Sequence, residues 1–334
     1  MNIRVTRDQL VRYRLRASHL DSKLPSGSFA AAAWGGLQDS VPRGGVISLH
    51  ARVEGTRPDS WEDPSLVQIW FRGGADYIVP RADVGVFTLG ALPRDPEQVE
   101  RLDRLADDIH RVTKGRTLKV REVQSLLSLE NPMLVKTTSV TGRVHIRWDA
   151  SNIWLIPAER PEVDAEEARL ELGRRFVHWF GPTTLQLLVR WTGLSPDDAK
   201  ATWHGLRKEL VPVDAAGRER FALSSDVEAL VGAEPVRGVR LIPFDDPLTK
   251  VDKEMLMPDE ADRRKVIPPA GTSLGYIPGA VLVDGEIVGA WQRQQRKVTI
   301  HPLRPLAAAD RSEIEQEALT FPIAGTSKPT VSWD

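Results

Sequence analysis

The feature that most constrains the fold is a run of three helices and a β-hairpin between residues 164 and 223. Each predicted helix begins at a residue whose side chain can cap it, and the first helix stops at Gly181-Pro182. Short apolar stretches on either side of Gly217 predict the hairpin. The expected helices run over 165–180 after a cap at Asp164, from a cap at Thr183 to Gly193, and from Ser195 to Leu210.

This order of elements is that of a winged helix, whose third helix lies where DNA-reading helices enter the major groove. In this chain the third helix carries acids as well as bases, namely Asp197, Asp198, Lys200, Lys208 and Glu209. Such a mixed surface attracts phosphate weakly, and many winged helices serve as protein scaffolds. We keep Lys200 and Lys208 as candidate DNA contacts, with the scaffold role as the alternative.

Composition excludes several classes of protein. The 334 residues include no cysteine, which rules out disulfide frameworks, thiolate zinc sites and cysteine nucleophiles. The seven histidines are scattered, and neither a phosphate-cradling glycine motif nor a Gly-x-Ser-x-Gly motif occurs. We therefore expect no metal and no cofactor. The sequence also lacks an apolar run of membrane-spanning length and a secretory signal, so we expect a cytoplasmic monomer with no membrane partner.

Helix and strand patterns elsewhere predict further modules on both sides of the winged helix. A capped amphipathic helix is expected over 6–19 and a charged helix over 96–113. Alternating apolar residues predict strands over 144–148 and 153–156, and Asp284-Gly285 predicts a hairpin turn in a β-rich C-terminal part. The expected architecture is an α+β protein with modules at 1–115, 116–233 and 234–334.

The stretch from Gly35 to Gly45, GGLQDSVPRGG, places polar residues between an apolar approach and a glycine-rich exit. The alanines before it predict a helix over 28–40, which Pro42 would end. Three polar side chains would then lie in the last turn or just beyond it, namely Gln38, Asp39 and Ser40. These residues alone leave two interpretations open, an ordinary polar helix end or the corner of an active site.

Several separated stretches resemble, in the same order, the winged-helix-repeat family that contains the AlkZ and YcaQ DNA glycosylases. They are GGLQDSVPRGGVISLHARVEG, VQIWFRGGADYIVPRADVGVFT, the segment from Glu166 to Arg218, and VRLIPFDDPL with GAVLVDGEIVGAWQRQ. The resemblance implies tandem winged-helix modules in a C-shaped body that holds double-stranded DNA. It also implies cleavage of the N-glycosidic bond of alkylated purines, including N7-alkylguanine adducts and crosslinks, and antibiotic self-resistance in some members.

The family's catalytic signature is a glutamine, any residue, and then a glutamine or aspartate, which position a water against the sugar. By this resemblance Gln38 is the first glutamine, Asp39 the free middle position and Ser40 the second catalytic position. Serine departs from the signature, because it is shorter and has no charge to steady the cationic transition state. Asp39 would replace it only if the backbone changed at the helix end, since neighbouring helical side chains point about 100° apart.

A second departure lies in the stretch RGGADY, where many relatives carry a histidine near the position of Asp76. The resemblance implies that Arg72 and Gly73 are structural residues of a turn. Asp76 has two interpretations, a cap at the start of a strand or a relocated catalytic carboxylate.

Candidate DNA contacts are basic residues near the predicted cleft and on predicted strands and turns. Arg143 and Arg147 alternate along one face of the expected hairpin, where they are either solvated or in contact with phosphates. Because the net charge is −1, DNA binding has to use local patches. The full set is Arg43, Arg72, Arg143, Arg147, Lys200, Lys208, Arg293 and Arg296.

Three functions remain open on these grounds. The first is a DNA glycosylase for bulky alkylpurine lesions, in which Gln38 positions water and Asp39 or Ser40 is its partner. The second is a non-catalytic winged-helix protein that binds DNA or senses lesions. The third is a self-resistance protein that binds a DNA-alkylating natural product as a small molecule or adduct.

Overall fold

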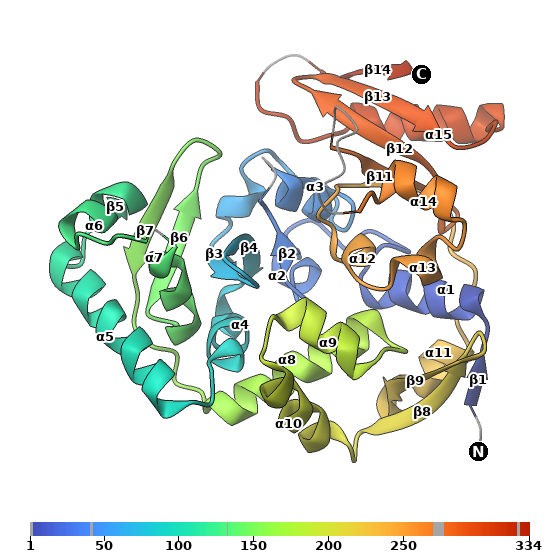
Figure 1. The fold of residues 1–334 in the computed structure, drawn as a ribbon. Helices are drawn as coiled ribbons and strands as arrows, with labels where there is room; N and C mark the ends of the chain where they lie inside the picture. The colour runs from blue at the N-terminus through green and yellow to red at the C-terminus, as the bar shows by residue number, and fades with distance from the viewer. Residues whose placement is uncertain (1–2, 41–42, 132, 270–276, 326–327) are drawn as a thin grey trace.

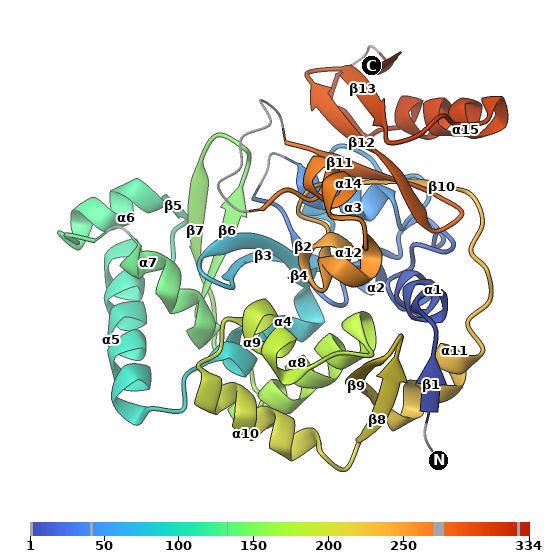
Figure 2. The same ribbon diagram turned by 45° about the vertical axis from the view of Figure 1, so that its right-hand side comes forward.

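The structure is a computed structural model that describes all residues except 1–2, 41–42, 132, 270–276 and 326–327. Within these residues the strands form three sheets, with helices around and between them (Figure 1). A six-stranded sheet lies toward one end of the molecule and a three-stranded sheet toward the other, while the C-terminal sheet covers a further side (Figures 1 and 2). The predicted α+β class is therefore confirmed.

The six-stranded sheet carries the predicted catalytic stretch at one edge. Its strands are β2 (Leu37–Gln38), β3 (Leu66–Phe71), β4 (Ala75–Pro80), β5 (Leu118–Lys119), β6 (Val144–Trp148) and β7 (Ile153–Pro157). Along the chain, α5 (Pro96–Thr113) lies between β4 and β5, and α6 (Val120–Leu126) and α7 (Leu134–Thr137) lie between β5 and β6. The strand order is β2-β4-β3-β6-β7-β5, with antiparallel neighbours. Ile109, Val123 and Val135 of the helices share an apolar cluster with Trp70 and Ile146 of the sheet. The predicted helix over 96–113 and the predicted hairpin are confirmed.

The winged-helix order of three helices and a hairpin is present as predicted. Its elements are α8 (Ala165–Phe180), α9 (Leu185–Thr192), α10 (Pro196–Leu206), β8 (Leu210–Ala215) and β9 (Arg218–Leu223). The side chains of Asp164, Thr184 and Ser195 accept hydrogen bonds from the first turns of the three helices. The N-terminal strand β1 (Ile3–Val5) extends the hairpin as a parallel partner of β8.

Two of these helices begin or end at a different residue than predicted. Thr184 rather than Thr183 caps α9, because the backbone of Thr183 is already paired with β9. The third helix ends at Leu206 rather than at Leu210, because Leu210 pairs with Leu223 in the hairpin. Both differences arise where strand pairing takes residues that local propensity assigns to a helix.

The prediction of one helix over 28–40 is wrong. The helix α2 covers Phe29–Ala32, and β2 follows after a Gly-Gly pair. Gly36 has a φ of +79°, which is outside the helical region, and Gly35 lies so close to the ring of Trp179 that a Cβ would not fit. The chain then pairs with β4. Pro42, expected to end the helix, lies outside the described residues, and α3 (Gly44–His50) comes next.

The C-terminal part is β-rich, as predicted. A five-stranded sheet contains β10 (Val239–Ile242), β11 (Gly279–Val283), β12 (Glu286–Gln294), β13 (Lys297–Pro302) and β14 (Thr330–Trp333). Asp284 and Gly285 form the predicted turn between β11 and β12, both with positive φ. Ile314 and Ala318 of α15 (Ala308–Leu319) pack into the cluster of this sheet. The other helices are α1 (Arg7–Ala17), α4 (Val84–Thr88), α11 (Val227–Val231), α12 (Pro247–Lys250), α13 (Lys253–Leu256) and α14 (Glu260–Val266).

Buried contacts join segments of all three predicted modules. Asp252, between α12 and α13, accepts hydrogen bonds from Arg14 of α1 at 2.9 Å and from Arg220 of β9 at 2.8 Å. All three side chains are buried. The largest apolar cluster likewise extends from Phe29 to Val251. The three predicted modules therefore share a core, and their boundaries stay a prediction.

Candidate active site

The extended chain at β2 distributes the predicted catalytic residues over two faces of the sheet. Gln38 pairs with Tyr77 of β4, and the N–H of Asp39 donates to the carbonyl oxygen of Asp76 at 2.8 Å. Successive side chains of an extended chain point to opposite faces. Gln38 and Ser40 therefore share one face, and Asp39 points to the other.

Gln38 and Ser40 are in direct contact. Nε2 of Gln38 donates to Oγ of Ser40 at 3.2 Å, and the O–H of Tyr77 donates to Oε1 of Gln38 at 3.4 Å. Burial raises the pKa of Tyr77 to about 12, so its phenol stays protonated and remains a donor. Oγ of Ser40 also accepts from the N–H of Asp76 at 3.3 Å. With both lone pairs accepting, Ser40 keeps its own O–H to donate to a further partner.

Asp39 is fully buried and lies against the start of α3. One carboxylate oxygen accepts from the N–H of Gly45 at 2.8 Å, and the other accepts from Arg43 at 3.1 Å and from Gln68 at 3.3 Å. Burial raises the pKa of Asp39 to about 7, while Arg43 and the Gly45 N–H act in the opposite direction. Gln68 in turn accepts from the N–H of Trp148 at 2.7 Å. Asp39 therefore ties β2 to α3, β3 and β6.

Arg43 lies between two indole rings. Its guanidinium carbon is 4.1 Å from the ring centre of Trp61 and 5.4 Å from that of Trp148, both within the range of cation–π attraction. Nη2 also donates to the carbonyl oxygen of Trp148 at 2.9 Å. The side chain is 20% exposed. Most of the Arg43 side chain, which was predicted to contact DNA, therefore interacts with other residues of the protein.

Asp76 is the second residue of β4 and is buried. Burial raises the pKa of its carboxyl, against the opposite effects of Lys136 and Trp70. Because Tyr77 follows it directly and points toward Gln38, the carboxyl of Asp76 faces away from Gln38 and Ser40. Its backbone N–H and carbonyl oxygen, rather than its side chain, form hydrogen bonds with Ser40 and Asp39.

Basic side chains from four separate segments lie close enough to interact electrostatically with Lys253 or with Tyr77. Arg72, in the turn between β3 and β4, interacts with the Tyr77 phenol and opposes the effect of burial on its pKa. Burial, followed by the charges of Lys250, Arg190 and Arg72, lowers the pKa of Lys253, while the carboxylate of Glu254 acts in the opposite direction. Arg72 was among the predicted DNA contacts, whereas the other three basic residues were not. They lie on α9, α12 and α13, and no local sequence signal links them to the motif.

Tyr77 itself was also missed as a site residue, although a signal for it existed. It lies in the stretch RGGADY directly after Asp76, and a cap at the start of a strand was one interpretation of Asp76. The alternation of a strand would have placed it on a different face from Asp76. The pairing of Gln38 with this strand, which identifies the partner, is visible in the structure alone.

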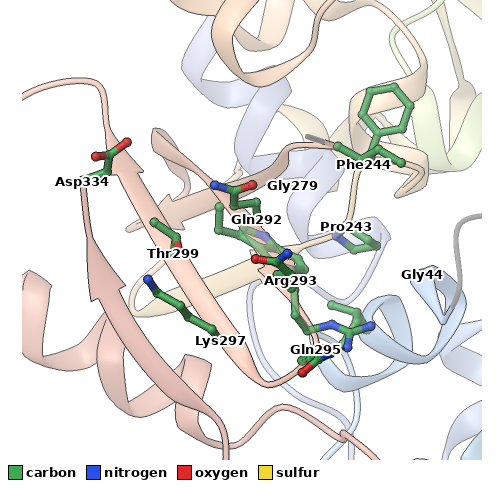
Figure 3. Close-up of a pocket in the computed structure, with 14 residues that line it drawn as sticks. Gly44, Pro243, Phe244, Gly279, Gln292, Arg293, Gln295, Lys297, Thr299 and Asp334 are labelled. Atoms are coloured by element: carbon green, nitrogen blue, oxygen red, sulfur yellow. Dashed lines mark hydrogen bonds between the residues drawn. The ribbon is translucent and has the colours of Figure 1, made fainter. Parts of the chain in front are cut away.

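A pocket of about 700 Å³ lies between the start of α3 and the C-terminal sheet (Figure 3). One wall includes Gly44, where a Cβ would lie 3.7 Å from the carbonyl oxygen of Gln38. Another wall carries Arg293 and Lys297 (Figure 3). Burial lowers the pKa of Arg293, and its Nη1 donates to the carbonyl oxygen of Gln295 at 2.8 Å. Arg293, a predicted DNA contact, therefore lines the same pocket as Gly44, which lies next to the backbone of Gln38.

Most of the remaining predicted DNA contacts have partners within the protein. Three are paired with carboxylates, namely Arg143 with Asp107 at 2.5 Å, Arg147 with Glu62 at 3.0 Å and Lys200 with Asp197 at 3.7 Å. Arg296 donates to the carbonyl oxygen of Ala324 at 2.5 Å, and Lys208 is exposed. Exposed ion pairs are weak and can exchange for phosphate contacts, so these residues stay predicted DNA contacts.

Within the part of the chain that the structure describes, no cluster of three or more His, Asp and Glu side chains is arranged to hold a metal ion. Over the same residues, every helix is too short or too polar to span a membrane.

A known family matches most of this chain. The family of AlkZ-like DNA glycosylases matches residues 31–321. An interstrand DNA cross-link repair glycosylase from Streptomyces sahachiroi is 30% identical over 165 residues, which are 47% of this chain and 42% of that protein's length. The solved structure of Streptomyces sahachiroi DNA glycosylase AlkZ has the same fold, with a TM-score of 0.79 over 99% of this chain and 100% of that one, at 18% identity. The chain therefore belongs to the AlkZ-like DNA glycosylase family.

Proposed function

We propose that this protein is a DNA N-glycosylase that releases bulky alkylated purines, such as N7-alkylguanine adducts or crosslinks, from double-stranded DNA. The observation that carries the proposal is the contact between Gln38 and Ser40 at 3.2 Å, at the motif position of an AlkZ-like family member. Spacing of two residues on a strand brings both side chains to one face. The glutamine-x-glutamine/aspartate spacing of the family therefore suits an extended chain.

In the proposed reaction, Gln38 and Ser40 hold a water molecule against the anomeric carbon of the damaged nucleotide. Tyr77 orients the Gln38 amide, and the free O–H of Ser40 donates to the water oxygen. The water attacks the anomeric carbon as the bond to the alkylated purine breaks, and it loses one proton to solvent. The purine leaves with the bonding electrons, which neutralise the positive charge that N7-alkylation gives to its ring. A neutral hydroxyl gives less stabilisation of the cationic sugar than a carboxylate, so we expect a slower enzyme than an aspartate at this position would give.

The partner of Gln38 in this proposal is Ser40, and Asp39 acts as a positioning residue. Asp39 is fully buried and its oxygens are occupied by Gly45, Arg43 and Gln68. Its carboxylate supports the strand that carries the motif instead of contacting the substrate.

The cations Arg72, Arg190, Lys250 and Lys253 support a DNA-bound reaction. Arg72, Arg190 and Lys250 all act on Lys253, Arg72 also interacts with Tyr77, and Lys250 is paired with the carboxylate of Asp245. The net charge of the whole chain is −1, so DNA binding has to use such local groups. We propose that they hold phosphates beside the lesion, within the C-shaped arrangement of tandem winged-helix modules that the family resemblance implies.

The test is release of modified base from duplex DNA that carries a bulky N7-alkylguanine adduct. Gln38→Ala is expected to slow release by about a hundredfold or more, because one water-positioning group is lost. Gln316→Ala, an exposed glutamine on α15, is the matched control and should equal the wild type. Equal rates for wild type and Gln38→Ala, or no release by the wild type, would contradict the proposal.

A second candidate function is a non-catalytic protein that binds DNA or senses lesions. Two observations favour it: serine occupies the second motif position, and the neighbouring carboxylate of Asp39 is buried. This alternative predicts salt-dependent DNA binding without base release by the wild type. It also predicts that Ser40→Gln restores the signature and creates base release from an inactive starting point.

A further inference from the structure

A second cavity, of about 690 Å³, lies beside the β3–β4 turn and is covered by α5 and α7. We call it the α5–α7 pocket. In both views of the ribbon, α7 lies between α5 and the sheet (Figures 1 and 2). The pocket contains neither Gln38 nor Ser40 among its lining residues.

The floor and one rim of the α5–α7 pocket are apolar. Trp70 of β3 and Leu102 and Leu105 of α5 line it. Met133 and Leu134, at the start of α7, line it as well and are 50% and 42% exposed. Two adjacent exposed apolar side chains at the mouth of a concave apolar surface are typical of a ligand site.

The charged side chains that line the α5–α7 pocket are all basic, although the carboxyl of Asp76 behind the lining lies close enough to Lys136 to interact with it. Arg72, Arg101 and Lys136 line the pocket, and none of its described lining residues is acidic. Nζ of Lys136 donates to the carbonyl oxygen of Gly74 at 2.9 Å and lies 5.7 Å from the ring centre of Trp70. This ammonium is therefore held at the apolar floor, where it would attract an anionic group of a ligand, with part of its charge offset by the Asp76 carboxyl.

The pocket is coupled to the candidate active site through one strand. Gly74, whose carbonyl receives Lys136, lies two residues before Asp76, whose N–H donates to Ser40. Arg72 lines the pocket and also interacts with Tyr77. A ligand in the pocket would therefore rest on the same turn that supports the motif.

We propose that the α5–α7 pocket binds an amphipathic anion, with an aromatic or aliphatic body against Leu102, Leu105 and Met133 and a carboxylate, sulfonate or phosphate at Arg101 and Lys136. This chemistry has two sources. One is a free small molecule, and the other is a bulky group carried on DNA, whose neighbouring phosphate supplies the charge. The inference goes beyond base release and does not depend on it.

The test uses the full chain and the fluorescent probe anilinonaphthalene sulfonate, compared with phenyl-naphthylamine, which has a similar body without the anion. We expect one saturable sulfonate site, with binding of the neutral probe about tenfold weaker. Arg101→Ala should weaken sulfonate binding about threefold to fivefold, as for a partly exposed ion pair. Thr137→Trp, at an exposed lining position, should fill the space and abolish binding of both probes.

Arg104→Ala is the matched control, because Arg104 is exposed on the same helix and does not line the pocket. Its probe affinity should equal that of the wild type. Thermal unfolding of each variant verifies that the fold is kept. Unchanged affinity in both Arg101→Ala and Thr137→Trp, or binding that does not saturate, would overturn the proposal.

Competition then identifies the source of the ligand. Displacement of the sulfonate probe by adducted duplex DNA, and not by unmodified duplex, supports a group carried on DNA. Retention of the probe with both duplexes supports a free small molecule. Neither the binding measurement nor the competition measures base release. Failure of the pocket proposal would therefore appear as altered probe binding, and failure of the glycosylase proposal as absent base release.

Discussion

Gln38 and Asp39 are neighbours in sequence, yet they have different environments because strand geometry sends them to opposite faces. Gln38 contacts a hydroxyl and a phenol, while Asp39 is buried against a guanidinium and an amide. The family resemblance identified Gln38 and Ser40 as the motif. It did not identify the partner that orients Gln38, since Tyr77 lies 39 residues away along the chain.

At the residue scale, we predict that Asp39 makes stability depend on pH. Its pKa is raised to about 7 in the folded protein, above the ordinary value of 3.8, so the folded state holds a proton that the unfolded state releases. Stability contributed by this proton is present at low pH and is lost as the pH rises toward about 7. Because of this group, the free energy of unfolding of the wild type, measured with urea, should fall by about 1.4 kcal/mol per pH unit between about pH 4 and 7. The Asp39→Asn variant should lack this decrease.

Asp59→Asn, a substitution of an exposed carboxylate, is the control for this experiment and should run parallel to the wild type. If the free energy of unfolding of Asp39→Asn also depends on pH in the same way as that of the wild type, the buried carboxyl does not retain its proton in the folded state.

At the scale of elements, the motif strand is positioned by the helix that follows it. The α3 helix begins at the Asp39 contact and ends at a second buried contact, where Arg52 meets Asp246 at 2.7 Å and 2.9 Å. Asp246 also accepts from Ser48 of α3 at 2.7 Å and caps α12. The stretch FDDPL, which carries part of the family resemblance, is thus a structural link between α3 and the region that bears Lys250.

The link between α3 and α12 gives a prediction about stability. Asp246→Leu should lower the free energy of unfolding by about 3–5 kcal/mol, because it leaves the fully buried Arg52 without its counter-charge. Adding Arg52→Met should recover at least about 1 kcal/mol, since the unpaired charge is then removed as well. Urea unfolding of the single and double variants measures both the loss of unfolding free energy in Asp246→Leu and its recovery in the double variant.

The exposed pair of Arg57 and Asp59 provides the comparison for this cycle. Its removal should change stability by less than about 1 kcal/mol. Strict additivity of the Arg52 and Asp246 substitutions would contradict a direct energetic link between α3 and α12.

At the scale of the whole molecule, a net charge of −1 means that DNA affinity depends on where the basic residues gather. We predict that Arg72, Arg190, Lys250 and Lys253 contribute up to four phosphate contacts, and hence a slope of about −3.6 in log affinity against log salt. Lys253→Gln and Arg190→Gln should each make the slope less steep by about 0.9. Fluorescence anisotropy with duplex DNA measures it.

Arg264→Gln on α14 removes an equally basic residue that is paired with Glu260 on the surface. It should leave the slope unchanged. A slope that is insensitive to Lys253 and Arg190 but changes with Arg143 or Lys208 would favour these two DNA contacts predicted from sequence over the group of cations around Lys253.

Sequence alone determined the elements whose cause is local. The helix at 96–113 and the caps Asp164 and Ser195 follow from side chains within one or two turns, and the Asp284-Gly285 turn follows from two residues. The family resemblance predicted Gln38 as a catalytic residue, and this assignment stays a prediction. The tertiary structure decided what depends on partners far along the chain, because the free energy of strand pairing and burial outweighs local helix propensity there. It made residues 37–38 a strand, buried Asp39, brought Tyr77 into contact with Gln38, and brought Arg72 and Arg190 close to Lys253.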